Sequence, residues 1–162
     1  PLVHGGGQER GLRSGTVATH QIVWMGEAAA ICHESLAVES ERIADLRRRL
    51  WSHLAQIPGS HLNGSEERSV PGILNVAFEG IDEEVVLRSL DDVAISSGSA
   101  CTSTTVEPSH VLLAMGVRRD LAACSFRFSI GRFNSEDDIV HAGNRLAQIL
   151  DRLRSQRVAQ TG

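Results

Sequence analysis

One cysteine, Cys101, lies in a ten-residue run, residues 96–105, whose other members are all Ser, Thr, Gly or Ala. These residue types favour turns and local side-chain hydrogen bonds, and none is large enough to fix the run to a core. We therefore expect an exposed, movable loop. An accessible cysteine held as thiolate is a nucleophile, whereas a structural cysteine is normally a small buried side chain. Composition alone equally permits a flexible linker that contains a cysteine.

Arg127 is a second candidate, because it stands in an alternating stretch, residues 125–132. Phe126, Phe128 and Ile130 would share the apolar face of a half-buried strand, which leaves Arg127 on the polar face. A guanidinium held there can receive a carboxylate in a bidentate pair. The alternative is an internal ion pair with an Asp or Glu of the chain.

The third candidate region is the glycine-rich opening, where five of residues 1–16 are glycine. We expect a loop there. Glycines let backbone amides approach a ligand closely, and Arg10, Arg13 and Thr16 are suited to hold an anion. An ordinary surface loop is the alternative. A Gly-x-Ser-x-Gly nucleophile elbow, which would accompany an esterase oxyanion loop, is absent from the sequence.

The elements that position these candidates follow from the hydrophobic pattern. Helical spacing begins at Thr19 and returns over residues 43–57 after a softer stretch, before Pro58 and Gly59 end it. Strands are predicted at residues 73–78, 93–95 and 125–132, and helices after Asp82, from Pro108 to Met115, and from Ser135 to Leu153. Residues 155–162 are expected to fray.

Composition indicates one soluble domain: 162 residues, 41% hydrophobic, 22% charged, net charge −4. Nothing favours nucleic acid, an anionic membrane surface or a membrane span. No signal peptide is visible, and the chain does not begin with Met, so we expect missing residues before Pro1. Three unpaired cysteines fit a reducing, cytoplasmic setting.

Several other residues are interpreted as structural rather than functional. No His or Cys spacing predicts a metal site. Cys124 is expected to be buried, and Cys32 with His33 to serve packing and surface. The run Arg47-Arg48-Arg49 is expected to form a solvated helix face.

Three separated motifs together resemble cysteine desulfurases, pyridoxal-phosphate enzymes of the class V aminotransferase family. The resemblance is to the type with a long catalytic loop that serves iron–sulfur cluster assembly. The motifs are residues 96–101 followed by Glu107-Pro108-Ser109, residues 4–11 with 13–16, and residues 126–129 with 131–133. They match only the C-terminal half of such an enzyme, so we expect a fragment of a longer polypeptide. A shortened C-terminal extension after Arg154 puts docking to scaffold proteins in doubt.

The resemblance implies an α/β fold of fold type I aminotransferases. Residues 1–36 would be the last loop and helix of the large cofactor-binding domain. Residues 37–162 would form the small α+β C-terminal domain, a mainly antiparallel sheet packed against helices that carries the catalytic cysteine loop.

The resemblance also implies roles. Cys101 would take the sulfur of L-cysteine as a persulfide and release L-alanine, Arg127 would bind the substrate carboxylate, and Thr16 would touch the cofactor phosphate in the partner subunit of a homodimer. A sulfur-acceptor or iron–sulfur scaffold protein would receive the sulfur. A selenium-containing substrate is left open.

One composition feature departs from that family. All 16 basic residues are Arg, so the chain has no lysine for a Schiff base to pyridoxal phosphate. The isolated chain is therefore expected to be inactive. The alternative is a non-enzymatic module that carries thiol or persulfide, or that dimerises.

Overall fold

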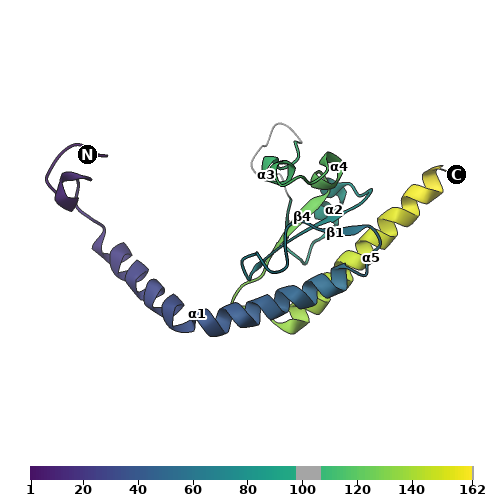
Figure 1. The fold of residues 1–162 in the computed structure, drawn as a ribbon, viewed down its shortest axis with the longest axis horizontal. Coiled ribbons are helices and arrows are strands. Elements are labelled where there is room, and N and C mark those ends of the chain that lie inside the picture. The colour runs from purple at the N-terminus through teal and green to yellow at the C-terminus, as the bar shows by residue number, and fades with distance from the viewer. Residues whose placement is uncertain (98–106, 162) are drawn as a thin grey trace. The chain divides into compact units, whose positions relative to one another are not determined.

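The computed structural model describes residues 1–97 and 107–161, and its backbone falls into two compact units, Pro1–Val38 and Glu39–Gly162. Figure 1 shows the elements in chain order. The division at residue 36 concerns domains of a longer polypeptide and stays a prediction. Each unit is described by itself below.

The first unit contains a loop and the first part of a helix. Its loop closes on itself, because the Leu2 amide donates to the Leu12 carbonyl at 2.7 Å and the Ser14 amide to the Val3 carbonyl at 3.2 Å. A short 3-10 turn, η1 (Glu9–Gly11), interrupts the predicted loop. Helix α1 (Thr19–Leu54) begins where the sequence predicts and is continuous, so the softer stretch before residue 43 is helical as well.

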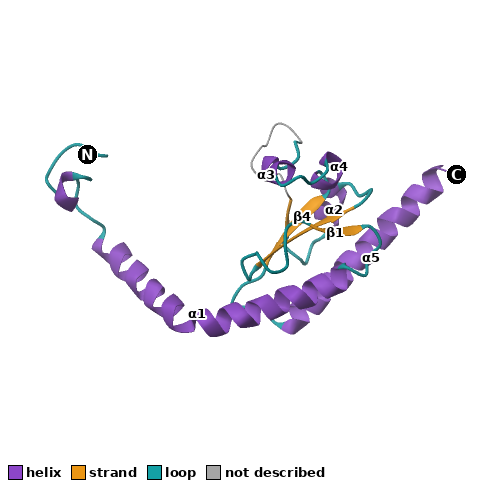
Figure 2. Cartoon of the chain, in the orientation of Figure 1, coloured by secondary structure: helices purple, strands orange, loops and turns teal. Residues whose placement is uncertain are grey.

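The second unit is built on a four-stranded antiparallel sheet in the order β1-β2-β4-β3. Figure 2 draws its strands in orange. Its strands are β1 (Ser60–Leu62), β2 (Ile73–Phe78), β3 (Ser96–Ser97) and β4 (Ser125–Ser129). The α/β class with a small antiparallel sheet is thereby confirmed. Strand β1 escaped the sequence analysis because three residues are too few to show alternation. The strand predicted at 93–95 was placed wrongly, since pairing with β4 begins at Ser96.

The helices of this unit are α2 (Glu83–Ser89), α3 (His110–Ala114), α4 (Arg119–Ala122) and α5 (Glu136–Thr161), together with the end of α1. The carboxylate of Asp82 caps α2 by accepting from the amides of Glu84 and Val85. The four-residue helix α4 was not predicted. The tail was predicted wrongly: α5 continues to Thr161, and Arg157 donates to the Gly80 carbonyl at 2.6 Å.

One face of the sheet packs on α1 and α5 and forms the core (Figure 1). The strand residues of this face alternate as the pattern requires, and the largest of them, Phe78 and Phe126, are fully buried with ring centroids 6.0 Å apart. Close approach of the two helices is visible at Gly143, where an added Cβ would lie 3.0 Å from the Cβ of His53. Within residues 1–97 and 107–161, no helix is long and apolar enough to cross a membrane.

Candidate functional site

Arg127 stands on the sheet face that lies opposite the core. Phe126 and Phe128 on either side of it are buried, while Arg127 and Ser129 are exposed. The predicted alternation therefore holds at these four positions. Ser125 departs from it, because it is fully buried although it shares the face of Arg127.

Burial of Ser125 has a local cause, since the segment that contains α4 lies over this end of the sheet. The Ser125 hydroxyl donates to the Leu121 carbonyl at 2.7 Å, and its register partner Ala77 is also fully buried. The polar face is thus covered at the Ser125 end and open at the Arg127 end.

A row of polar residues crosses the open part of this face. Arg127 is the register partner of Asn75 on β2 and of Ser96 on β3, so all three share one face. Asn63, which follows β1, donates from Nδ2 to Asn75 Oδ1 at 2.7 Å. Sequence reasoning missed Asn63 and Asn75, because only the strand pairing brings them beside Arg127. It assigned Ser96 to the loop of Cys101, which was wrong at Ser96 and Ser97, since these residues form β3.

The guanidinium of Arg127 makes one weak contact, a hydrogen bond of 3.4 Å from Nη2 to the Ser96 hydroxyl. Within the part of the chain that the structure describes, no carboxylate pairs with it. The internal ion pair that the sequence left open is therefore not formed there. An exposed guanidinium with most of its donors unused is suited to receive an anion.

Cys101 lies outside the described residues, as does most of its Ser/Thr-rich run. The strand that leads to it does not: β3 ends at Ser97 and is paired to β4 beside Arg127. The other two cysteines are described. Cys32 on α1 is exposed, and Cys124 is buried as predicted. Burial raises the pKa of the Cys124 thiol above its usual value, which keeps it protonated and unreactive.

Thr16 lies in the first unit and is exposed, next to Gly15, whose φ of +99° is in the region that favours glycine. The Gly15 amide donates to Gln8 Oε1 at 3.2 Å, and Arg13 Nη1 donates to the Gly15 carbonyl at 3.0 Å. These bonds hold the turn that presents Thr16. The structure describes Thr16 in the first unit and Arg127 in the second.

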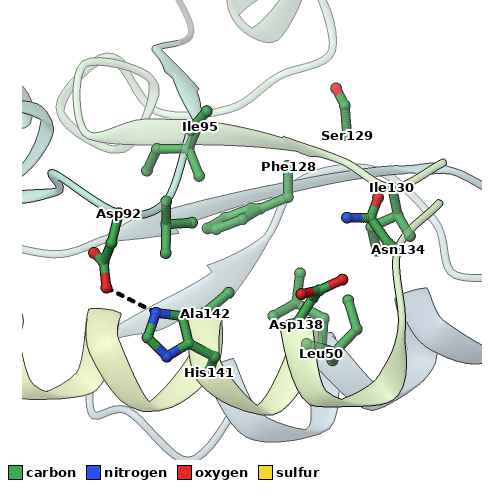
Figure 3. Close-up of a pocket in the computed structure, with 13 residues that line it drawn as sticks. Leu50, Asp92, Ile95, Phe128, Ser129, Ile130, Asn134, Asp138, His141 and Ala142 are labelled. Atoms are coloured by element: carbon green, nitrogen blue, oxygen red, sulfur yellow. Dashed lines mark hydrogen bonds and ion pairs between the residues drawn. The ribbon is translucent and has the colours of Figure 1, made fainter.

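A cavity of about 390 Å³ lies in the second unit on the core side of β4 (Figure 3). Phe128 and Ile130 line its apolar wall, whereas Ser129 points away from them. Its rim carries the pair His141 Nε2 and Asp92 Oδ2 at 2.7 Å. Burial opposes the Asp92 charge, but hydrogen bonds from His141 and Arg145 prevail and lower the pKa of that carboxyl. Neither Arg127 nor Thr16 lines this cavity.

Among the described residues, no group of three His, Cys, Asp or Glu side chains is placed to hold a metal ion.

The arginine run was predicted wrongly at one position. Arg48 and Arg49 are exposed and pair with Asp45, but Arg47 is buried and donates to Ser69 Oγ at 2.7 Å and to the Glu66 carbonyl at 2.6 Å. Arg47 fixes the loop between β1 and β2.

Comparison with known proteins agrees with this architecture. A family model described as aminotransferase class-V matches residues 4–141. A curated relative named cysteine desulfurase IscS, from Shewanella sp. (strain ANA-3), is 50% identical over 152 residues, which are 94% of this chain and 38% of the relative. The chain thus spans well under half the length of that relative.

Solved structures give the same result. A structure titled NifS-like protein superposes with a TM-score of 0.81 at 34% identity, covering 93% of this chain and 39% of the other. Another, titled SspA in complex with cysteine, superposes with a TM-score of 0.56 at 32% identity, covering 83% of this chain and 36% of the other. The likeness extends over both units described here.

Proposed function

This chain belongs to the aminotransferase class-V family, and we propose that it is the C-terminal part of a pyridoxal-phosphate-dependent cysteine desulfurase. The observation that carries the proposal is the open polar face of the sheet. It presents Arg127 without a carboxylate partner among the described residues, and β3 leads from the same face toward Cys101. The relatives named cysteine desulfurase support it.

The residues of this chain fit pyridoxal phosphate only in part. With no lysine among its 162 residues, the chain has no amine side chain to hold the cofactor covalently. Thr16, exposed on its glycine turn, is suited to the cofactor phosphate of the partner subunit in a homodimer. The lysine must come from the part of the relatives that this chain does not span.

Pyridoxal phosphate bound by the whole protein would supply an electron-withdrawing ring that takes up electrons released from the substrate. The chain's own residues would do the rest. Arg127 would bind and orient the carboxylate of L-cysteine. The Cys101 thiolate would attack the substrate sulfur, forming an S–S bond while the carbon–sulfur bond breaks. The electron pair stays with the carbon, which takes up a proton, and the products are L-alanine and a Cys101 persulfide.

Covalent connectivity supports this division of work between Cys101 and Arg127. Cys101 is four residues after Ser97, the last residue of the strand that is paired beside Arg127. A covalent connection this short favours assigning both residues to one site.

The destination of the sulfur belongs to the proposal as well. We infer that a sulfur-acceptor or iron–sulfur scaffold protein takes it from Cys101, in a cytoplasmic, reducing setting that keeps the exposed thiol of Cys32 free. A homodimer is part of the same proposal, since Thr16 is assigned to the partner's cofactor.

The alternative is a thiol-carrying or dimerising module without enzymatic activity, which the missing lysine favours for the chain on its own. One experiment separates the two. The longer polypeptide containing this chain, with pyridoxal phosphate, is expected to show a visible absorption band that shifts on adding L-cysteine, and to release sulfide under reducing conditions. If the band is absent, or does not shift with L-cysteine, the cysteine desulfurase is contradicted and the module without enzymatic activity is favoured.

Variants make this experiment specific. Cys101→Ser should abolish sulfide release and keep the visible band, because the cofactor anchor lies elsewhere. Cys32→Ser, the matched change of an exposed cysteine on α1, should release sulfide like the parent. Arg127→Ala should mainly raise the KM for L-cysteine, since a lost charge-assisted pair costs about 1.5–3 kcal/mol. Unchanged sulfide release by Cys101→Ser would refute the assigned nucleophile.

A further inference from the structure

The polar face beside Arg127 contains a hydrogen-bond chain whose direction is fixed at one end. The Ser125 hydroxyl donates to the Leu121 carbonyl at 2.7 Å, so its single proton is used. Asn63 Nδ2 lies 2.9 Å from Ser125 Oγ, and because that hydroxyl has no second proton, Asn63 Nδ2 must be the donor. The buried hydroxyl therefore fixes which atom of the Asn63 amide is nitrogen.

This direction passes on to Asn75. Asn63 Nδ2 has two protons; one goes to Ser125 Oγ and the other to Asn75 Oδ1 at 2.7 Å. The Asn75 amide oxygen is thereby turned toward β1, where it accepts. Its Nδ2 group, among the described residues, donates to no protein atom, and its two protons remain available on the half-buried face.

Asn75 is directly opposite Arg127 in the register of β2 and β4. Side chains in such pairs are separated by about 5 Å at Cβ and share one face. On the other side Arg127 contacts Ser96. The strand residues of this face include no Asp or Glu. They are His61, Ile73, Asn75, Ala77, Ser96, Ser125, Arg127 and Ser129, and Glu79, just beyond β2, pairs with His61 at 3.0 Å.

We propose that Asn75 Nδ2 is a second donor to the substrate carboxylate that Arg127 binds, and that Asn63 and Ser125 are positioning residues that keep the amide turned the right way. The inference rests on the proposed function, because it takes the anion to be the carboxylate of L-cysteine. A guanidinium and an oriented amide donor on one face together suit a planar anion with two acceptor oxygens.

The test uses the longer polypeptide with pyridoxal phosphate, and Asn75→Ala as the first variant. Loss of one hydrogen bond should raise the KM for L-cysteine about five- to tenfold, with kcat within about twofold. The inhibition constant of L-alanine should rise by the same factor. That of L-alaninamide, whose carboxylate is replaced by a neutral amide, should not change. Asn144→Ala, an exposed asparagine on α5, is the matched control and should behave as the parent.

Two further variants guard against a purely structural effect. Asn75→Asp keeps the shape but places a carboxylate opposite Arg127, and should raise the KM by more than Asn75→Ala does. Asn63→Asp removes the donor to Asn75 Oδ1, so the Asn75 amide should turn over, give its Nδ2 to Asp, and present its oxygen to the substrate. This variant should weaken the binding of L-cysteine and of L-alanine, but not that of L-alaninamide.

The outcomes are separable. The role of Asn75 would be overturned if the KM for L-cysteine is unchanged in both Asn75 variants. It would also be overturned if L-alanine and L-alaninamide lose binding affinity equally. An unchanged KM in Asn63→Asp alone would overturn the positioning chain. If Arg127→Ala leaves the KM unchanged, the carboxylate site of the proposed function fails; if Arg127→Ala raises it and the Asn75 variants do not, only the present inference fails.

Discussion

Residues 1–38 and residues 39–162 keep their apolar side chains in opposite places. In the second unit the large apolar residues of the strands and helices face each other, and Phe78, Val76 and Phe126 are fully buried. In the first unit no residue is buried, and Trp24 and Met25 are 68% and 75% exposed. The same types of residue thus form a core in one region and a surface in the other.

The difference is concentrated in the part of α1 that belongs to the first unit, where the apolar side chains are exposed. Four consecutive large apolar residues, Ile22 to Met25, point to all sides of α1, and each is more than half exposed. A sheet with two helices completes a core from residues 39–162 alone. Residues 1–38, taken by themselves, form no core and leave their large apolar side chains exposed.

The largest test of this comparison pairs two aromatic residues. Phe126→Ala in this chain should lower the free energy of unfolding by about 3–5 kcal/mol, because it empties a fully buried site. Trp24→Ala, in the exposed stretch of the first unit, should change it by less than about 0.5 kcal/mol. Urea unfolding followed by circular dichroism measures both, and comparable losses would break the comparison.

Two glycines, Gly72 in the second unit and Gly26 in the first, give a second test of the comparison. Gly72 packs where β2 meets β4, and an added Cβ would clash with the Ile130 carbonyl oxygen, so Gly72→Ala should lower the free energy of unfolding by about 3 kcal/mol. At Gly26, inside α1, an added Cβ meets nothing within 4 Å, and Gly26→Ala should raise helix content and stability by about 0.5–1 kcal/mol. Thermal unfolding of both variants, with helicity from circular dichroism, decides; equal destabilisation would contradict the prediction.

The smallest expected effect concerns an exposed ion pair of the second unit, Arg118 with Asp120. The Arg118 guanidinium, which donates to both carboxylate oxygens of Asp120, lowers the pKa of that carboxyl to about 2. The folded state therefore favours the charged form, and its contribution is present above the unfolded pKa near 3.8 and lost as the pH falls through about 2.

Asp120→Asn should make the loss of stability between pH 4 and pH 2 slightly shallower, and Arg118→Gln should do the same. Because both side chains are exposed, we expect a small change. Unfolding midpoints in urea across this pH range provide the measurement. A slope identical to that of the parent in both variants would show that the pair contributes nothing.

The sequence predicted the parts of the fold that repeat a pattern. Strand β4 with Arg127 outward, the start of α1 at Thr19 and the buried Cys124 all follow from alternation, capping or burial tendencies of neighbouring residues. Elements too short to show a period, β1 and α4, escaped, and the helical end of α5 was missed because residues 155–161 have no apolar periodicity to display.

The candidate site was predictable only one residue at a time. Arg127 has a signal in its own stretch, but Asn63, Asn75 and Ser96 become its neighbours through strand pairing across up to 64 residues of sequence, from Asn63 to Arg127. Arg47 gave a misleading signal, because its neighbours Arg48 and Arg49 are solvated while it turns inward to Ser69. Local composition does not predict which distant residues become neighbours through strand pairing.

The register of β2 and β4 has a consequence for how this chain can vary in length. Removing Ser125 or Phe126, with the start of the strand kept in register, would move Arg127 to the core side and Phe128 to the open side, since side chains alternate along a strand. The segments from 64 to 71 and from 90 to 95 carry no such alternation. In related chains we expect insertions and deletions to gather in those two segments and to be absent from β2 and β4.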